Sequence, residues 1–233
     1  MSATRADSRP MLPERLTTSL YHVAAAARGR ALARRVMRRQ DAPAVMRAHP
    51  DAFRPLVRLL SRDCDSVLDV GTGLMSSLEL VGCRVKLGVD AHRPYLEQRR
   101  VVDAVPINAP ADRLTSLFVP GAVDLVTLID VLEHFASEDA RVVLRQAEAV
   151  AARRVVLFTP RGEFPQSGFD AFGLGGEEYQ RHRSTWESED LAANGYRVAV
   201  LTGLHNASNA SFVKAFGRDA PPVDALLAWK DRG

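Results

Sequence analysis

The stretch "SVLDVGTGLMSSLELVG", residues 66–82, decides the fold. It begins as an apolar strand, turns at Gly71 and Gly73, and continues as a helix expected over Leu74–Val81. Glycines at such a turn let the backbone approach a ligand closely. A third glycine would be ordinary in a nucleotide-binding turn, but here the chain reads Met75-Ser76-Ser77, and the two serines are expected to cap the helix.

Strands and helices alternate after this stretch. Several of the strands are almost continuously apolar, as in "VDLVTLID" and "RVVLFTP", which is typical of a parallel sheet covered on both faces. The predicted strands are Ser66–Val70, Val85–Asp90, Val105–Asn108, Val123–Asp130, Val155–Thr159, Tyr196–Thr202 and Ala210–Phe216. Further helices are predicted at Ala52–Ser61, Pro94–Val102, Ser137–Ala152 and Ser188–Asn194. The pattern predicts a doubly wound α/β domain.

Length and composition fit one globular domain. The chain has 233 residues, of which 46% are hydrophobic and 25% charged. No apolar run approaches the roughly 18 to 20 residues of a membrane span, and no secretory signal is evident, so we expect a cytoplasmic protein. The two cysteines, Cys64 and Cys83, predict neither a disulfide framework nor a zinc site.

Charge is distributed unevenly along the chain. Residues 1–50 carry a net +7 and the remainder −4, within a total of +3. Residues 14–39 predict a basic helix with an apolar stripe that includes Ala27 and Ala31. We therefore divide the chain into a basic N-terminal arm and helix (1–50) and a main domain (51–233). Three interpretations of the helix stay open: a lid over the acceptor pocket, a solvated or homodimer-forming helix, and a surface for an anionic membrane or nucleic acid.

Asp90 is the first candidate site residue outside the turn. It ends the second predicted strand, 19 residues after Gly71, where a carboxylate accepts hydrogen bonds from ribose hydroxyls in nucleotide sites. A helix N-cap near His92 is the alternative role. The turn is not G-x-G-x-x-G, because position 76 is Ser, which argues against a dinucleotide.

Several blocks together carry a resemblance. In order they are "VLDVGTG", "LGVD", "APADRL", "VDLVTLIDVLEHF" and "VVLFTP". In this order they resemble the class I S-adenosylmethionine-dependent methyltransferases over about Ser66 to Phe216. The resemblance implies a seven-stranded, mostly parallel Rossmann-like sheet with a final antiparallel strand, expected at Ala210–Phe216, preceded here by the N-terminal helical extension.

The resemblance also implies the cofactor, S-adenosyl-L-methionine, and its contacts. Asp69, Gly71 and Gly73 would surround the methionine part and the ribose, and Asp90 would bind the ribose hydroxyls. Ala111 and Asp112 stand where the family contacts adenine. Asp130 would lie beside the methionine amine and sulfonium. The pair of serines after Met75 resembles a variant form of the turn seen in some branches of the family.

Catalytic candidates follow the fourth predicted strand. Methyl transfer to a hydroxyl needs a base, and His134 or His182 is the candidate, with Asp130 beside the reacting group. His134 as a packing residue is the alternative. Asp130, Glu133, His134 and His182 also resemble the divalent-metal ligands, Mg²⁺ for instance, of some O-methyltransferases that act on ubiquinone precursors or small RNAs. The "VLEH" block is equally common in metal-independent relatives.

The long segment between the fifth and sixth predicted strands is expected to cover the acceptor. Residues 160–187 are rich in glycine and aromatics and too long for a connector. They resemble a branch of methyltransferases of polysaccharide and natural product biosynthesis, which makes Gln166, Tyr179, His182, Ser184 and Trp186 candidates for substrate contacts. A core position for Trp186 is the alternative.

The predicted function is methyl transfer to a small molecule or glycan, with oxygen as the expected acceptor atom. A non-catalytic S-adenosylmethionine-fold binding or partner protein is the alternative from another class. An RNA methyltransferase is the third option, and the acidic main domain argues against a nucleic-acid partner.

Overall fold

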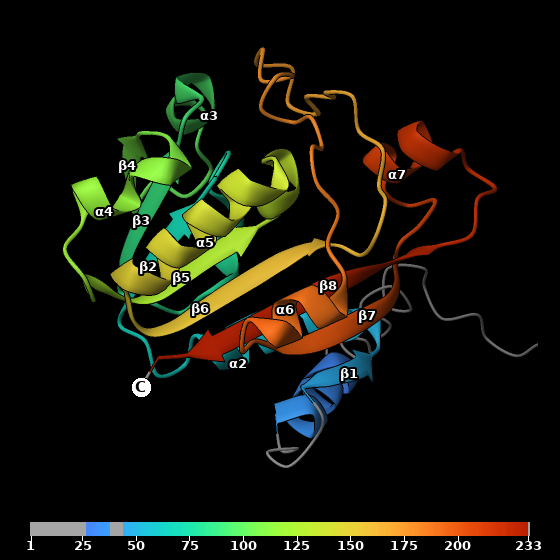
Figure 1. Cartoon of the computed structure of the whole chain (residues 1–233), viewed down its shortest axis with the longest axis horizontal. Helices are drawn as coiled ribbons and strands as arrows, with labels where there is room; N and C mark the ends of the chain where they lie inside the picture. The colour runs from blue at the N-terminus through green and yellow to red at the C-terminus, as the bar shows by residue number, and fades with distance from the viewer. Residues whose placement is uncertain (1–26, 38–43, 233) are drawn as a thin grey trace, which may run out of the picture.

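The computed structural model of the chain describes residues 27–37 and 44–232 (Figure 1). Its strands are β1 (Val45–Ala48), β2 (Ser66–Val70), β3 (Val85–Asp90), β4 (Val105–Asn108), β5 (Val123–Ile129), β6 (Ala151–Pro160), β7 (Arg197–His205) and β8 (Val223–Asp231). Its α-helices are α2 (Phe53–Leu60), α3 (Arg93–Glu97), α4 (Leu114–Leu117), α5 (Ser137–Val150), α6 (Ser188–Ala193) and α7 (Ala210–Phe216). Short 3-10 helices are η1 (Pro50–Ala52), η2 (Ser76–Leu80), η3 (Ala111–Arg113) and η4 (Leu132–His134). Residues 27–37, called the N-terminal helix below, are also helical.

The strands form one sheet in the order β1-β7-β8-β6-β5-β2-β3-β4. All neighbouring strands are parallel except β8, which lies antiparallel between β6 and β7. The predicted α/β class, the mostly parallel sheet and the final antiparallel strand are confirmed. The predicted number of seven strands is wrong, because β1 adds an eighth strand by parallel pairing with β7.

The residues of the final strand were predicted wrongly. Ala210–Phe216 is helix α7, and its start is capped by the Asn209 side chain, which accepts a hydrogen bond from the backbone N–H of Phe212 at 3.0 Å. The antiparallel strand is β8, whose segment Ala225–Trp229 is fully or almost fully buried between two neighbours. A short apolar run fits both the strand period and the helix period, and here the asparagine cap favours the helix.

Two hydrophobic cores lie on opposite faces of the sheet. One core contains residues of α2, η2 and the N-terminal helix, packed against one set of alternating strand residues, such as Val67 and Val156. The other contains α4, α5 and α6, packed against the alternate set, such as Leu68 and Val155. Burial of consecutive strand residues on both faces explains why these strands read as continuous apolar runs.

The N-terminal helix buries a different stripe from the predicted one. Ala27 and Ala31 are exposed, whereas Ala33 and Val36 are buried in the core that contains α2. The remainder of the predicted helix, including residues 14–26, lies outside the described residues. β1 falls within the segment 1–50 that the sequence assigns to the basic arm. In the described ranges, no helix is long and apolar enough to cross a membrane.

Candidate active site

The turn after β2 places three residues in the left-handed backbone region. They are Gly71 (φ 64°), Gly73 (φ 53°) and Met75 (φ 62°). A β-carbon on Gly71 would lie 2.7 Å from Cγ2 of Val131, so only glycine fits there without a shift. The helix predicted at Leu74–Val81 is instead the 3-10 helix η2, which starts after Met75 with no side-chain cap. The predicted capping by Ser76 and Ser77 is therefore wrong.

Asp69 stabilises this turn by accepting hydrogen bonds from side-chain hydroxyls. It is 1% exposed and accepts hydrogen bonds from the hydroxyls of Thr72 (2.7 Å), Thr127 (2.5 Å) and Ser77. Burial raises the pKa of Asp69, and the three hydroxyl donors lower it. Both carboxylate oxygens are occupied by protein donors, and Asp69 does not line the cavity described below.

Asp90 also stabilises the turn, by accepting hydrogen bonds from the backbone. Its Oδ2 accepts a hydrogen bond from the backbone N–H of Gly73 and its Oδ1 one from that of His92, both at 2.8 Å. Burial raises the pKa of Asp90, while these two backbone donors lower it. His92, not Asp90, is the N-cap residue of α3. Asp90 also faces a cavity, and its carboxylate keeps free lone pairs for a ligand there.

That cavity, of about 290 Å³, lies at the carboxyl ends of β2, β3, β4 and β5. This is the edge where doubly wound sheets bind their ligands. Among the predicted site residues, its lining contains Gly71, Gly73, Asp90, Ala111, Asp130, His134 and Tyr179. Asp112 is exposed outside the lining, and Gln166, His182 and Trp186 do not line it either.

Asp130 combines an unusual backbone with a second carboxylate close by. Its φ is 54°, a left-handed conformation that aspartate tolerates better than most residues, and its side chain is open to the cavity. Its recessed position and the neighbouring Glu133 carboxylate raise the pKa of Asp130. Burial raises the pKa of Glu133 to about 7. Asp130 in the cavity lining and Glu133, buried beside it, are thus two close carboxyl groups that resist full ionisation together.

Glu133, His134 and His182 form a compact cluster. One ligand atom from each lies within 4.8 Å of the others, although 48 residues separate the two histidines along the chain. Glu133 Oε2 accepts a hydrogen bond from Thr159, whereas Oε1 is buried and has no partner within the described chain. Burial lowers the pKa of each histidine to about 4. The cluster therefore presents neutral imidazoles beside one unsatisfied carboxylate oxygen.

The donor set of this cluster fits a divalent metal ion. Nδ1 of His134 lies 3.3 Å from the Arg181 carbonyl oxygen, and Nδ1 of His182 lies 2.7 Å from that of Phe164. When Nδ1–H donates to a backbone carbonyl, Nε2 keeps its lone pair for a metal or a proton. Asp130, the fourth predicted ligand, is next to the cluster but is not one of its three members.

The segment 160–187 closes one side of the cavity. It contributes Glu178, Tyr179, Gln180 and Arg183 to the lining. Hydrogen bonds tie it down at two points: Arg183 N–H donates to the Glu133 carbonyl at 2.7 Å, and the Leu174 carbonyl lies 2.8 Å from Nε2 of the His92 side chain. The segment thus contacts both η4 and His92 at the start of α3.

The other candidates of this segment have structural partners. Gln166 donates from Nε2 to the Gln180 carbonyl at 2.7 Å and accepts from His182 N–H at its own carbonyl. Trp186 is 4% exposed, belongs to the core around α5, and donates to the Ser184 hydroxyl. In the described conformation, these side chains hold the segment rather than face the cavity.

Sequence reasoning missed some residues near the site. Asp139 and Arg183 line the cavity but belong to no recognisable motif. His205, at the end of β7, is 5% exposed, and neither ring nitrogen has a hydrogen-bond partner among the described residues. Its ring lies 5.2 Å from that of Phe164, which in turn lies 5.6 Å from that of His182. Only the fold brings this histidine toward the cluster.

Comparison with solved structures identifies the architecture. An S-adenosylmethionine-dependent methyltransferase from Mesorhizobium loti superimposes with a TM-score of 0.50 at 16% identity, covering 82% of this chain and 99% of that one. The fold is that of the S-adenosylmethionine-dependent methyltransferases. The YcgJ protein from Bacillus subtilis gives a TM-score of 0.52 at 17% identity, over 77% and 97% of the two chains.

A third neighbour covers more of the chain. The plantazolicin methyltransferase BamL, solved with a triazolic desmethyl-plantazolicin analogue and S-adenosylhomocysteine, gives a TM-score of 0.50 at 12% identity over 94% of this chain and 91% of that one. No family model matches the sequence, and no curated protein matches it significantly. At these identities the neighbours establish the fold, while function has to be argued from the site.

Proposed function

We propose that this chain is an S-adenosyl-L-methionine-dependent methyltransferase. One observation carries the proposal: a single cavity at the carboxyl edge of the sheet brings together Gly71, Gly73, Asp90, Ala111 and Asp130, from the ends of the four strands β2, β3, β4 and β5. They are five of the seven residues that the sequence motifs select for the cofactor, since Asp69 and Asp112 lie outside the lining. Their convergence on one cavity supports a common ligand.

Each wall of the cavity suits one part of the cofactor. Asp90 would accept hydrogen bonds from the ribose hydroxyls while it keeps its bonds to Gly73 and His92. Ala111, in η3, offers an apolar surface to adenine, whereas Asp112 beside it lies outside the lining. The carboxyl group of Asp130 would face the positively charged methionine end of the cofactor. Gly71 and Gly73 leave room for the ligand near the backbone.

The acceptor would enter from the side of Tyr179, Arg183 and His134. An in-line displacement needs the nucleophile held against the methyl group with water excluded, which the segment 160–187 can provide. We propose a hydroxyl acceptor on a small molecule or glycan, with His134 or His182 taking its proton. The plantazolicin methyltransferase BamL, solved with a triazolic desmethyl-plantazolicin analogue, has a similar fold over most of this chain, and this favours the small-molecule option over RNA.

A divalent ion held by Glu133, His134 and His182 is part of this proposal. Two imidazoles and one carboxylate favour Mn²⁺ or Zn²⁺ over Mg²⁺. Asp130, which lines the cavity together with His134, would orient the acceptor. When bound, such an ion would make an acceptor hydroxyl more acidic. The protein's own part is to fix both imidazoles through the carbonyls of Arg181 and Phe164.

Calorimetric titration with S-adenosylmethionine and S-adenosylhomocysteine tests the cofactor assignment. Both are expected to bind. Asp90→Asn keeps the shape but loses the charge, and we expect at least about 30-fold weaker binding, on the order of 2 kcal/mol for hydrogen bonds to a charged group. Asp103→Asn, at an exposed acid in the loop before β4, is the matched control and should bind normally. Absence of binding by the unmodified protein would defeat the proposal.

A further inference from the structure

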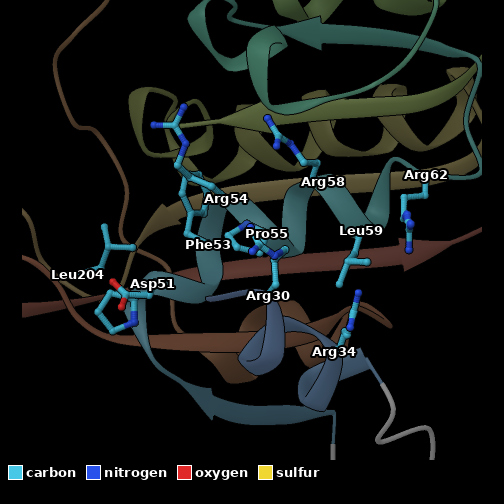
Figure 2. A pocket seen from close by; sticks show the side chains of 11 residues that line it. Arg30, Arg34, Asp51, Phe53, Arg54, Pro55, Arg58, Leu59, Arg62 and Leu204 are labelled. Carbon is cyan, nitrogen blue, oxygen red and sulfur yellow. The ribbon is translucent and has the colours of Figure 1, made fainter. Parts of the chain in front are cut away.

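A second and larger hollow lies away from the cofactor cavity. It has a volume of about 680 Å³ and shares no lining residue with that cavity. The N-terminal helix and α2 form its walls, and Leu204 near the end of β7 closes one end (Figure 2). We call it the arginine groove. It is lined by Arg30, Arg34, Pro50, Asp51, Phe53, Arg54, Pro55, Arg58, Leu59, Arg62 and Leu204.

The groove is strongly positive. Its arginines come from two helical stripes, 30/34 on the N-terminal helix and 54/58 on α2, with Arg62 just beyond α2. The four-residue spacing puts each pair on one face of its helix. Within residues 27–37 and 44–232, none of the five guanidinium groups has an acidic partner or a side-chain hydrogen bond. All five arginines are exposed.

Asp51, the one acid among the described residues of the lining, does not neutralise this charge. Asp51 Oδ2 lies 3.3 Å from Nε of Arg28 and 3.6 Å from Nδ1 of His49, and neither of these residues lines the groove. Arg28 thus compensates Asp51 from outside. The groove is left with a net charge close to that of its five arginines, which would repel one another unless an anion lies between them.

The rest of the lining is apolar. Pro50, Phe53, Pro55, Leu59 and Leu204 contribute hydrocarbon surface, and the ring of Phe53 packs against Phe158 with centroids 4.5 Å apart. Apolar surface recessed between cations is costly to leave in water and favours an apolar group as occupant. A purely inorganic anion would satisfy the guanidinium groups alone.

We propose that the arginine groove binds one molecule of an amphiphile, with a phosphate-bearing headgroup among the arginines and an aliphatic chain along the apolar floor. Guanidinium groups bind phosphate oxygens in paired hydrogen bonds, and several of them suit one or two phosphate groups. Nucleic acid fits less well, because Phe53, the only aromatic ring among the described lining residues, already packs on Phe158. A recessed floor also suits one inserted chain better than a flat bilayer. This site is separate from the proposed cofactor site and does not depend on it.

The test uses the full-length protein and dodecyl phosphate below its critical micelle concentration, with binding measured by calorimetry. Sodium pyrophosphate reports on the anion alone, and dodecyl maltoside, also kept monomeric, on the chain alone. We expect dodecyl phosphate to bind at least about tenfold more tightly than either. Equal binding of pyrophosphate, or no binding of dodecyl phosphate, would overturn the proposal. So would binding to phosphatidylglycerol vesicles without binding to monomeric dodecyl phosphate, since that would indicate a membrane surface.

Variants locate the site. Arg54→Gln combined with Arg58→Gln should weaken dodecyl phosphate binding at least about tenfold. The control is Arg145→Gln, an exposed arginine on α5, which packs on the opposite face of the sheet. Leu59→Ala should weaken dodecyl phosphate several-fold and leave pyrophosphate unchanged. Circular dichroism melting verifies that each variant is folded. Unchanged affinity in the double arginine variant would place the ligand elsewhere and refute the assignment.

Discussion

Replacement of Gly71 by alanine tests the geometry of the turn that begins the site. The new β-carbon would lie 2.7 Å from Cγ2 and 3.2 Å from Cγ1 of Val131, a residue that is 3% exposed. Gly73, two residues on, has a similar φ, 53° against 64°, but the nearest atom to its β-carbon is 4.0 Å away. Both substitutions carry the left-handed backbone strain, and only the first adds a clash.

The magnitudes follow from these two terms. Left-handed strain costs about 1–2 kcal/mol for a residue with a β-carbon, and overpacking of a core adds about 1–3 kcal/mol. We therefore expect Gly73→Ala to lower the free energy of unfolding by about 1–2 kcal/mol and Gly71→Ala by about 2–5 kcal/mol. Urea unfolding at equilibrium measures both, provided that the m-value stays constant.

Removal of the clashing atoms gives the decisive control. Val131→Ala deletes both γ-carbons and by itself costs about 1–3 kcal/mol. In that background, Gly71→Ala should cost no more than Gly73→Ala does in the unmodified chain. The double-mutant cycle should thus show a favourable coupling of about 1–3 kcal/mol between positions 71 and 131. Gly71→Ala costing as much beside alanine as beside valine would refute the steric explanation.

Three further predictions concern other parts of the molecule. Backbone N–H donors, first that of Asp65, hold the pKa of Asp124 below its usual value. The ionised Asp124 therefore stabilises the folded state fully above about pH 4, and this contribution is lost as pH falls through the folded-state pKa. Asp124→Asn should therefore be about 1 kcal/mol less stable in urea at pH 7 but not at strongly acidic pH, and a gap independent of pH would contradict this. Mn²⁺ or Zn²⁺ added after EDTA treatment should raise the melting temperature of the unmodified protein but not of Glu133→Gln, and full activity in EDTA would count against a metal. Asn209→Ala should cost about 1 kcal/mol through loss of its cap on α7, and an unchanged urea midpoint would speak against that cap.

The strands of the sheet are predictable where the local sequence fits a strand and no other element. Ser66–Val70, Val85–Asp90 and Val105–Asn108 are found with the predicted bounds, because each is a short run with a turn or an acid at its end. β1 and β8 were missed. β1 has only four residues and depends on pairing with β7, a long-range contact that leaves no local pattern.

The candidate site was predictable only where motif and chain order coincide. The turn and the acids that end strands meet at one cavity because carboxyl ends of neighbouring parallel strands share an edge of the sheet. The contact of His182 with His134, 5.0 Å between ring centroids, depends on how segment 160–187 folds back, and local sequence does not encode it. The same holds for Trp186, whose burial among residues of α5 and α6 follows from the path of the segment.

The absent third glycine has a physical explanation in the neighbouring strand. Met75 is fully buried, and a β-carbon on Gly88 of β3 would lie 2.8 Å from its Cε and 2.9 Å from Cγ2 of Thr72. Gly88 has no side chain, and this leaves room for the Met75 side chain beside β3. A methionine can therefore occupy the position where a third glycine would be ordinary. Two residues after Met75, the Ser77 hydroxyl donates a hydrogen bond to the buried carboxylate of Asp69. Because Asp69 has no cationic partner among these contacts, the hydroxyl donors are what make its charge tolerable. Methionine at position 75 therefore depends on Gly88 of β3 for space, and Ser77 supplies a hydrogen bond to Asp69. Gly71 and Gly73 line the cavity without a third glycine beside them.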